Sequence, residues 1–195
     1  MIVVGLTGGI GSGKTTILNY FKSFGVPVYI ADDEAKALMN RSKVIKKKLI
    51  ALFGEAAYKA GTLNRSYLSS KIFSDKTLLA KMNAIVHPKV ASHFKRWLKK
   101  QNAPYVIKEA AIIFEHNQDK QYHYIITVVA DENLRIERVV KRDNTSKEKV
   151  KNIIKNQLSD AEKIKKSDFV ITNNSLALAK KQAIKVHKKL LQISA

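Results

Sequence analysis

Residues 2–25 of the chain read IVVGLTGGIGSGKTTILNYFKSFG, and this stretch decides the fold. Residues 2–6 form a short apolar run, which is typical of a strand buried in a parallel sheet. Glycines then gather in residues 8–13, although the whole chain has only 8 of them. Beyond the glycines, apolar residues recur at helical spacing at Ile17, Leu18, Phe21 and Phe24. Gly25 is a suitable helix terminator, so the stretch predicts a strand, a tight glycine-rich turn and a helix.

The turn itself, GGIGSGKT at residues 8–15, fits the pattern G-x-x-x-x-G-K-[ST] of a phosphate-binding loop. Such a loop needs backbone N–H groups facing inwards and a helix beginning at its end, because both attract phosphate. We expect Lys14 to reach the β- and γ-phosphates and the Thr15 hydroxyl to ligate Mg²⁺. A chance glycine-rich turn is the alternative, but the flanking strand and helix favour the loop. No N-K-x-D run that would specify guanine is present, so ATP is the expected nucleotide. The predicted ATP-binding residues here are Gly9, Ile10, Gly11, Ser12, Gly13, Lys14, Thr15 and Thr16.

Further strands and helices alternate along the rest of the chain. Apolar, β-branched runs predict strands at 26–30, 105–109, 124–129 and 169–172. Helical periodicity occupies the segments near 33–53, 66–100, 133–166 and 175–193. This alternation predicts an α/β fold with a parallel five-stranded sheet covered by helices on both faces. The long gap between the predicted strands at 26–30 and 105–109 exceeds one crossover helix, so we expect it to hold a helical insertion that acts as a substrate lobe, at about 33–103.

The net charge is large for a chain of 195 residues. Lys and Arg number 36 against 16 Asp and Glu, a formal charge of +20. Such a charge indicates a polyanionic partner, which can be nucleic acid, an anionic membrane surface or a phosphorylated small molecule. Residues 36–50 and 76–108 carry basic residues and no acid, and both stretches fall in the expected lobe. Small polyphosphate substrates and a lysine-rich surface explain the charge, so we expect neither a nucleic-acid partner nor a membrane partner.

Several classes of protein are excluded by composition. The chain has no cysteine, which excludes disulfides, cysteine-ligated metal sites and a thiol nucleophile. No apolar run approaches the ~20 residues of a membrane span. The opening MIVVGLTGG lacks the basic and long apolar regions of a signal peptide. We therefore expect a cytoplasmic protein, either a monomer or a weak homo-oligomer.

Two carboxylates and two arginines are candidates for chemistry on the bound phosphates. Asp32 and Asp33 directly follow the second predicted strand, where ligands of open parallel sheets bind, so one of them can accept a proton from a hydroxyl. The alternative is that an aspartate here caps the following helix. Arg138 and Arg142 lie four residues apart on one helix face and can stabilise transferring phosphate. A solvated charged helix is the alternative reading of that segment.

The order of these motifs resembles the dephospho-coenzyme A kinase family. The resemblance rests on the opening phosphate loop and on blocks that follow it in order over nearly the whole chain. These are GVPVYIADDEAK at 25–36, LNRSYLSSKIF at 63–73, MNAIVHP at 82–88, IIFE at 112–115, RIERVVKRD at 135–143 and EKIKKSDFVITN at 162–173. Three positions depart from the family pattern: Ile30 replaces the first aspartate of D-A-D, Ala111 replaces a proline, and Thr172 stands where aspartate is common.

The resemblance implies the full fold: a P-loop NTPase core with a parallel five-stranded sheet, a helical substrate-binding insertion and a helical lid. The expected divisions of this single domain are a core of about 1–32, 104–132 and 167–195, a coenzyme-binding lobe of 33–103 and a lid of 133–166.

The resemblance also implies an activity and roles for individual residues. ATP, with Mg²⁺, would phosphorylate the ribose 3′-hydroxyl of dephospho-coenzyme A. Asp32 would be the base or orienting group, with Lys14, Arg138 and Arg142 stabilising the transition state. Arg142 and Asn173 would join the ATP site, and Glu109 would join Thr15 in holding Mg²⁺, acting through water. The substrate-binding residues would be Asp32, Arg65, His87, Ile113, Phe114 and Glu115.

The roles of His87 and Phe114 and the function of the protein each have an alternative interpretation. His87 precedes a proline and can equally cap or turn a helix. Phe114 at a strand end can stack on a base, whereas the other aromatics are expected to pack in cores. The second candidate function is a small kinase of a nucleoside monophosphate or a hydroxy acid. A nucleic-acid-binding ATPase is a third, suggested by charge alone.

Overall fold

A computed structural model describes residues 1–194, with the side chains of Ser74 and Lys76 left out. The chain divides into two compact units. The sheet unit comprises residues 1–29 and 101–195, and the helical unit comprises residues 30–100. The bounds of the helical unit, 30 and 100, each differ by three residues from the bounds expected for the lobe, 33 and 103.

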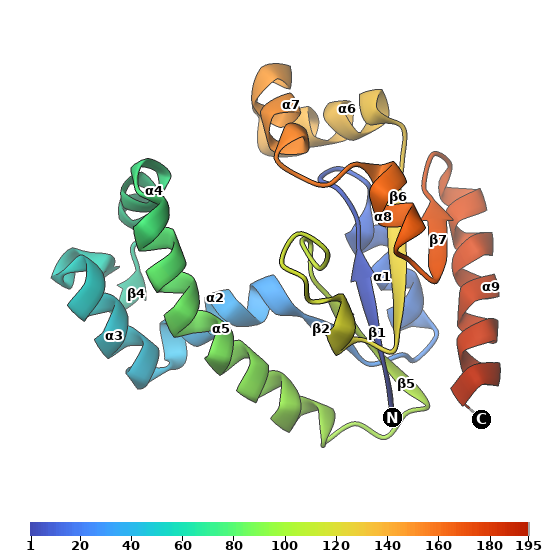
Figure 1. Cartoon of the computed structure of the whole chain (residues 1–195), viewed down its shortest axis with the longest axis horizontal. Helices are drawn as coiled ribbons and strands as arrows, with labels where there is room; N and C mark the ends of the chain where they lie inside the picture. The colour runs from blue at the N-terminus through green and yellow to red at the C-terminus, as the bar shows by residue number, and fades with distance from the viewer. Residues whose placement is uncertain (195) are drawn as a thin grey trace. The chain divides into compact units, whose positions relative to one another are not determined.

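The sheet unit is built on five strands in the order β2-β5-β1-β6-β7 (Figure 1). Their bounds are β1 Ile2–Thr7, β2 Val28–Ile30, β5 Tyr105–Glu109, β6 Tyr124–Val129 and β7 Phe169–Thr172. The pairs β1–β5, β1–β6 and β6–β7 are all parallel. The five strands predicted from apolar runs are therefore confirmed. In such a sheet the strands all finish at one edge, where ligands bind.

Helices pack against this sheet. Helices α1 (Lys14–Ser23) and α9 (Leu176–Ser194) contact each other, and α1 also contacts β1. Helix α9 contacts β5 and β7, while α8 (Asp160–Lys165) contacts β6. The fully buried residues of this core include Val4, Leu6, Ile17, Phe21, Val106, Ile107, Ile126, Val128, Ile171, Ala183 and Leu190. Both faces of the apolar strands are thus covered, as continuous apolar runs require.

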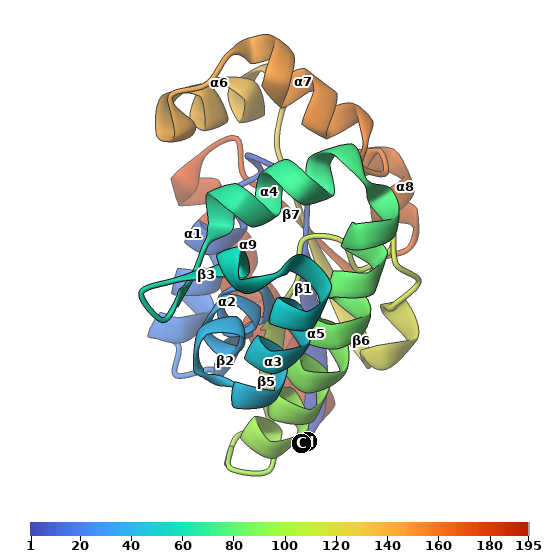
Figure 2. The same ribbon diagram turned by 90° about the vertical axis from the view of Figure 1, so that its left-hand side faces the viewer.

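Two more helices lie beyond the carboxyl edge of the sheet. Helix α6 (Glu132–Asp143) and helix α7 (Lys147–Lys155) pack together on Ile136, Val139 and Val150. Figures 1 and 2 both show them at the end of the sheet unit where β1 finishes. Ile10 of the loop after β1 packs against the same apolar cluster. Part of the expected lid therefore rests on the phosphate loop.

Strand β7 ends the sheet order, and a side chain bonds its outer edge. The Gln182 amide on α9 donates to the Thr172 carbonyl at 3.1 Å. Its oxygen accepts from the Thr172 N–H at 3.0 Å. One amide side chain therefore satisfies both backbone groups of Thr172.

The helical unit has its own core. Its elements are α2 Ala31–Arg41, α3 Lys43–Phe53, a 3₁₀ turn at Glu55–Ala57, β3 Tyr58–Lys59, β4 Thr62–Leu63, α4 Arg65–Ser74 and α5 Lys76–Leu98. Its buried residues include Leu38, Ile45, Leu49, Phe53, Ala57, Leu68 and Val86. The helical pattern at 33–53 is two helices because the Ser42 hydroxyl caps α3, accepting from the Ile45 N–H at 3.3 Å. The pattern at 66–100 is likewise interrupted, because Asp75 caps α5.

The hairpin of β3 and β4 was not predicted. Its turn places Ala60 and Gly61 at φ of +48° and +79°, and the short polar sequence has no strand periodicity. Across residues 1–194, helices that are both long and apolar enough to span a bilayer are absent.

Candidate active site

The phosphate loop, residues 8–15, joins β1 to α1 as the sequence predicts. Gly8, Gly11 and Gly13 have φ of +152°, +77° and +91°, values that side chains disfavour. Gly13 is the N-cap of α1, and its carbonyl accepts from the N–H groups of Thr16 and Ile17. The loop therefore brings its phosphate-binding residues to the start of a helix, where the dipole attracts anions.

Five consecutive carbonyls of this loop accept hydrogen bonds from side chains. Lys14 Nζ donates to the carbonyls of Gly8 at 2.9 Å and Gly9 at 3.4 Å. The carbonyls of residues 10, 11 and 12 accept in turn from Arg135 Nε at 2.9 Å, Arg138 Nη1 at 3.5 Å and Asn173 Nδ2 at 2.9 Å. A carbonyl oxygen repels phosphate, so pairing these oxygens with donors leaves the loop better suited to an anion.

The two predicted lid arginines are placed differently. Arg138 bonds the loop at Gly11 and also donates from Nη2 to the Asn173 carbonyl at 2.9 Å. Arg142 forms two bonds to Asp143, at 2.7 and 2.8 Å, and its side chain is 63% exposed. This hydrogen bonding raises the pKa of Arg142 and lowers that of Asp143. Of the two, Arg138 therefore contacts the loop directly, together with Asn173.

Arg135 and Gln157 contact the same loop and were missed from the sequence. Arg135 Nε donates to the Ile10 carbonyl, and Gln157 Oε1 accepts from the Ile10 N–H at 2.9 Å. One signal was available for Arg135, since α6 holds three of only six arginines in the chain. Gln157 follows α7 in a polar turn, and nothing in its neighbours distinguishes it.

Asp32 and Asp33 lie in the first turn of α2, two and three residues beyond the end of β2. The N-cap of α2 is Ile30, and neither aspartate makes a capping bond there. The capping alternative is therefore wrong. Asp33 pairs with Lys36 at 3.2 Å, and the Asp32 side chain is exposed. Negative charge in a first helical turn is favourable in itself.

Arg65 and His87 belong to the helical unit. Arg65 is the first residue of α4 and is exposed. His87 is exposed within α5, which continues through Pro88 to Leu98. The alternative in which this His-Pro pair caps or ends a helix is therefore wrong.

The IIFE segment is mostly packed inside the sheet unit. Ile113 is fully buried and Phe114 is 3% exposed, and both pack against Ile125. A ring so buried has no free face for a base, so the stacking expected of Phe114 is not available in this conformation. Glu115 pairs with Lys163 Nζ at 2.9 Å and accepts from the Leu158 N–H at 3.2 Å. Its carboxylate thus bonds the segment to α8.

The residues expected to hold metal have oxygen donors, as Mg²⁺ prefers. Thr15 is exposed in the first turn of α1. Glu109 ends β5 and is buried, and its negative charge adds to burial in raising the pKa of Tyr122. Among the described residues, no group of three or more His, Asp or Glu side chains is arranged so that it could hold a metal ion by itself. A site of one hydroxyl completed by substrate phosphates and water fits this donor set.

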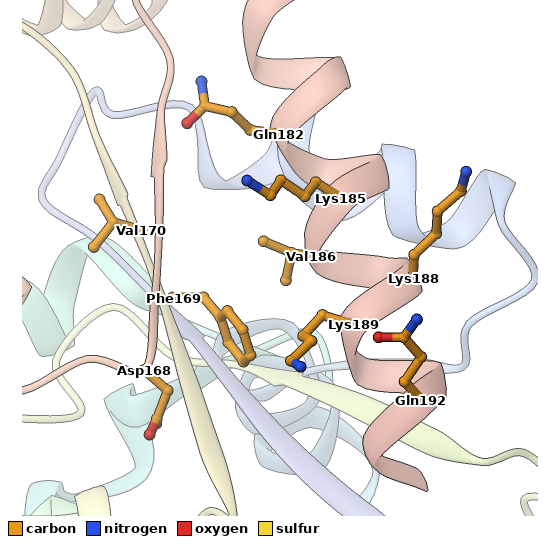
Figure 3. A pocket seen from close by; sticks show the side chains of 9 residues that line it. All are labelled: Asp168, Phe169, Val170, Gln182, Lys185, Val186, Lys188, Lys189 and Gln192. Atoms are coloured by element: carbon orange, nitrogen blue, oxygen red, sulfur yellow. The ribbon is translucent and has the colours of Figure 1, made fainter. Parts of the chain in front are cut away.

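A hollow of about 670 Å³ lies between β7 and α9 (Figure 3). Its walls combine Lys185, Lys188 and Lys189 with the apolar side chains of Phe169 and Val186. It includes Asp168, which precedes β7, and so it lies toward the opposite end of the strand from Asn173. It is therefore separate from the phosphate loop.

The comparisons with known proteins agree with this geometry. A family model described as dephospho-CoA kinase matches residues 2–178. The dephospho-CoA kinase of Bacteroides fragilis strain YCH46 is 39% identical over 174 residues, covering 89% of this chain and 85% of the relative. That of Fusobacterium nucleatum is 38% identical over 176 residues, covering 90% and 91%.

Solved structures give the same result for the fold. TT1252 from Thermus thermophilus is 31% identical with a TM-score of 0.88, covering 96% of each chain. Dephospho-CoA kinase from Campylobacter jejuni covers 99% of this chain and 98% of its own, at 23% identity and a TM-score of 0.72. The fold, the phosphate loop and these sequence relationships agree, and the chain belongs to the dephospho-CoA kinase family.

Proposed function

We propose that this protein transfers the γ-phosphoryl group of ATP to the ribose 3′-hydroxyl of dephospho-CoA, giving CoA and ADP. One observation carries the ATP half of the proposal: five successive loop carbonyls are paired with donors at the start of a helix. Membership of the family supports the acceptor. The activity is that of the last step in making coenzyme A, and a cytoplasmic protein suits it.

Binding of ATP would use the backbone of the phosphate loop. Within the predicted set Gly9 to Thr16, the N–H groups of Ile10, Ser12 and Thr16 already donate to Gln157, Gly9 and Gly13. The other N–H groups near the helix start would bind phosphate, where each charge-assisted bond is strong. Lys14 Nζ would leave the Gly8 and Gly9 carbonyls and reach the β- and γ-phosphates, because phosphate oxygens carry more negative charge. Asn173 would contribute by holding the Ser12 carbonyl at the rear of the loop.

Transfer of the phosphoryl group requires a proton acceptor and positive charge. The acceptor hydroxyl oxygen forms a bond to the γ-phosphorus, its proton passes to Asp32, and the bond from phosphorus to the ADP oxygen breaks. Lys14 and Arg138 would stabilise the negative charge that spreads over the transferring group. Arg142 would join them by leaving Asp143, since an exposed ion pair of this kind contributes little.

Mg²⁺ would be held by the Thr15 hydroxyl, with Glu109 as a second candidate acting through water. When bound, the ion would offset charge on the β- and γ-phosphates. The fold keeps the Thr15 hydroxyl at the start of α1, in the residue next to Lys14.

On the acceptor side, Arg65 and His87 are candidates because both side chains are exposed in the helical unit. Arg65 can pair with a phosphate of dephospho-CoA, and His87 can donate a hydrogen bond to one. Of the IIFE residues, Ile113 and Phe114 would act through packing, and Glu115 through its bonds to Leu158 and Lys163.

An acceptor panel tests the proposal. Purified protein with Mg-ATP should release ADP with dephospho-CoA, and the product should be phosphorylated at the 3′ position. Turnover of a nucleoside monophosphate or hydroxy acid, without turnover of dephospho-CoA, would establish the second candidate function instead. ATP hydrolysis stimulated by DNA or RNA, with steep salt dependence, would establish the third. Sedimentation of the same sample tests the expected monomer or weak homo-oligomer.

A further inference from the structure

Ile10, in the middle of the phosphate loop, is held through both of its backbone polar groups. Arg135 Nε donates to its carbonyl at 2.9 Å, and Gln157 Oε1 accepts from its N–H at 2.9 Å. These two bonds fix two successive peptide planes, the one before Ile10 and the one after it. Neither Arg135 nor Gln157 was expected to bind substrate.

The orientation of these planes determines where the neighbouring groups point. In a trans peptide the C=O and N–H lie on opposite sides. With the Ile10 carbonyl directed at Arg135, the N–H of Gly11 points away from Arg135 and from α6. With the Ile10 N–H directed at Gln157, the Gly9 carbonyl points the other way, where Lys14 Nζ and the Ser12 N–H bond it at 3.4 and 3.2 Å.

Arg135 is rigidly placed for this task. Its side chain is only 6% exposed, and its Nη1 pairs with Asp160 Oδ2 at 2.9 Å. The loop approaches it so closely that a Cβ at Gly9 would collide with its guanidinium, and a Cβ at Gly11 would collide with its backbone carbonyl. Arg135 therefore joins α6, α8 and the loop through one planar group.

Gln157 is also held on its far side. Its own N–H donates to the Ile154 carbonyl at 3.0 Å, which fixes it to the end of α7. The next N–H, of Leu158, donates to Glu115, and Glu115 pairs with the buried Lys163. The side chain of Gln157 thus extends to the loop from a turn bonded at both ends.

We propose that Arg135 and Gln157 are positioning residues for ATP: Arg135 aims the Gly11 N–H at the phosphates, and Gln157 keeps the preceding peptide from rotating. Asp160 supports the role by holding the Arg135 guanidinium. The inference rests on the proposed function and deepens it, because it names the residues that keep the loop ready for a polyphosphate.

The test measures binding of inorganic tripolyphosphate and of Mg-ATP by calorimetry, without acceptor. Gln157→Leu removes the acceptor for the Ile10 N–H while keeping similar volume. Arg135→Lys keeps a positive charge that can pair with Asp160, but it lacks the planar group that bonds Ile10 at the same time. Each variant should weaken tripolyphosphate and Mg-ATP about tenfold, equivalent to about 1.4 kcal/mol for one lost buried hydrogen bond. The KM for dephospho-CoA should stay within about twofold of wild type.

Gln182→Leu is the matched control, because Gln182 makes the same kind of bonds to the backbone of Thr172 on β7. It should lower the melting temperature like Gln157→Leu but leave the affinity for tripolyphosphate unchanged. Wild-type affinity in both Gln157→Leu and Arg135→Lys would overturn the proposal, as would equal weakening in Gln182→Leu. Failure of the wild type to phosphorylate dephospho-CoA would count against the proposed function only, because the binding experiment contains no acceptor.

Discussion

Asn173 Nδ2 donates to the Ser12 carbonyl at 2.9 Å and so joins the end of β7 to the phosphate loop, 161 residues earlier in the chain. Asn173 is 1% exposed, and its own N–H donates to the Val129 carbonyl of β6 at 2.8 Å. The approach is possible because Gly13 has no side chain. A Cβ at Gly13 would collide with the Asn173 amide nitrogen.

Gly13→Ala should therefore reduce ATP affinity as well as stability. Gly13 has φ of +91°, a region that alanine disfavours by roughly 1–2 kcal/mol. The methyl group must also displace Asn173 from Ser12. We expect the Kd for Mg-ATP, measured by calorimetry, to rise by at least tenfold.

Gly25→Ala separates the loss of stability expected of Gly13→Ala from its loss of ATP affinity. Gly25 has a similar φ of +82°, but a Cβ there meets no atom within 4 Å. It should cost comparable stability and leave ATP affinity unchanged. If the two variants bound ATP equally well, contact with Asn173 would have no part in shaping the loop.

In the proposed mechanism Lys14 stabilises the transferring phosphoryl group through its positive charge. Lys14→Ala should therefore lower kcat by roughly 10²–10³-fold. The lysine also bonds the carbonyls of Gly8 and Gly9, so some loss of ATP affinity should accompany the effect. Single-turnover rates at saturating ATP separate the two contributions. A variant with full kcat and a raised KM for ATP would show that Lys14 only binds.

In the proposed mechanism Asp32 accepts the proton of the acceptor hydroxyl, which an amide cannot do. Asp32→Asn should therefore reduce kcat by roughly 10²–10⁴-fold with little change in ATP affinity. Asp33 is the matched control, since it is its exposed neighbour and pairs with Lys36. Asp33→Asn should retain most activity. The reverse result would assign the proton acceptor to Asp33.

Lys163→Met should lower the free energy of unfolding by about 3 kcal/mol, because it leaves the Glu115 carboxylate without its buried charge partner. Lys163 is fully buried. Adding Glu115→Gln removes that charge but keeps an oxygen for the Leu158 N–H, so the double variant should recover more than half of the loss. Urea unfolding of the four proteins measures this cycle. Strict additivity of the two substitutions would contradict the pairing.

Acid should weaken the packing of His187. Its ring stacks on Phe24 with centroids 5.0 Å apart, its Nδ1 lies 2.6 Å from the Tyr105 hydroxyl, and burial lowers its pKa. The unfolded chain then binds a proton at higher pH than the folded chain. The neutral His187 ring therefore stabilises the folded state fully above the unfolded pKa of about 6.5. This contribution to the free energy of unfolding declines as the pH falls below that value. His187→Gln should flatten the decrease in melting temperature between about pH 7 and pH 5.

Much of the sheet unit could be predicted because its signals are local. Residues 2–6 are apolar without interruption and are followed by glycines, so the strand, the loop and α1 were all identified. The other four strands were found for the same reason. The break at Ser42 was harder to see, because apolar residues recur on both sides of it and only the capping hydroxyl marks the end of α2.

The candidate site was predicted less completely, because its geometry depends on contacts between distant segments. Arg138 was identified from charge and spacing, but the same argument chose Arg142, whose bonds are to Asp143. Arg135 is one turn from Arg138, yet only packing of α6 on the loop shows that it contacts Ile10. Phe114 was judged by its place at a strand end, whereas the apolar side chains around it bury the ring.

The bonds between Gln182 and Thr172 also bear on how copies of this chain behave in a crowded solution. An edge strand with free N–H and C=O groups is a template on which another molecule can extend the sheet. Here a side-chain amide occupies both groups of Thr172, and Lys185 and Lys189 stand beside the remainder of the strand (Figure 3). A strand approaching this edge would find the backbone groups of Thr172 already hydrogen-bonded, and it would meet the positive charges of the two lysines along the rest of β7. The helix that completes the core thereby also protects the sheet from edge-to-edge aggregation.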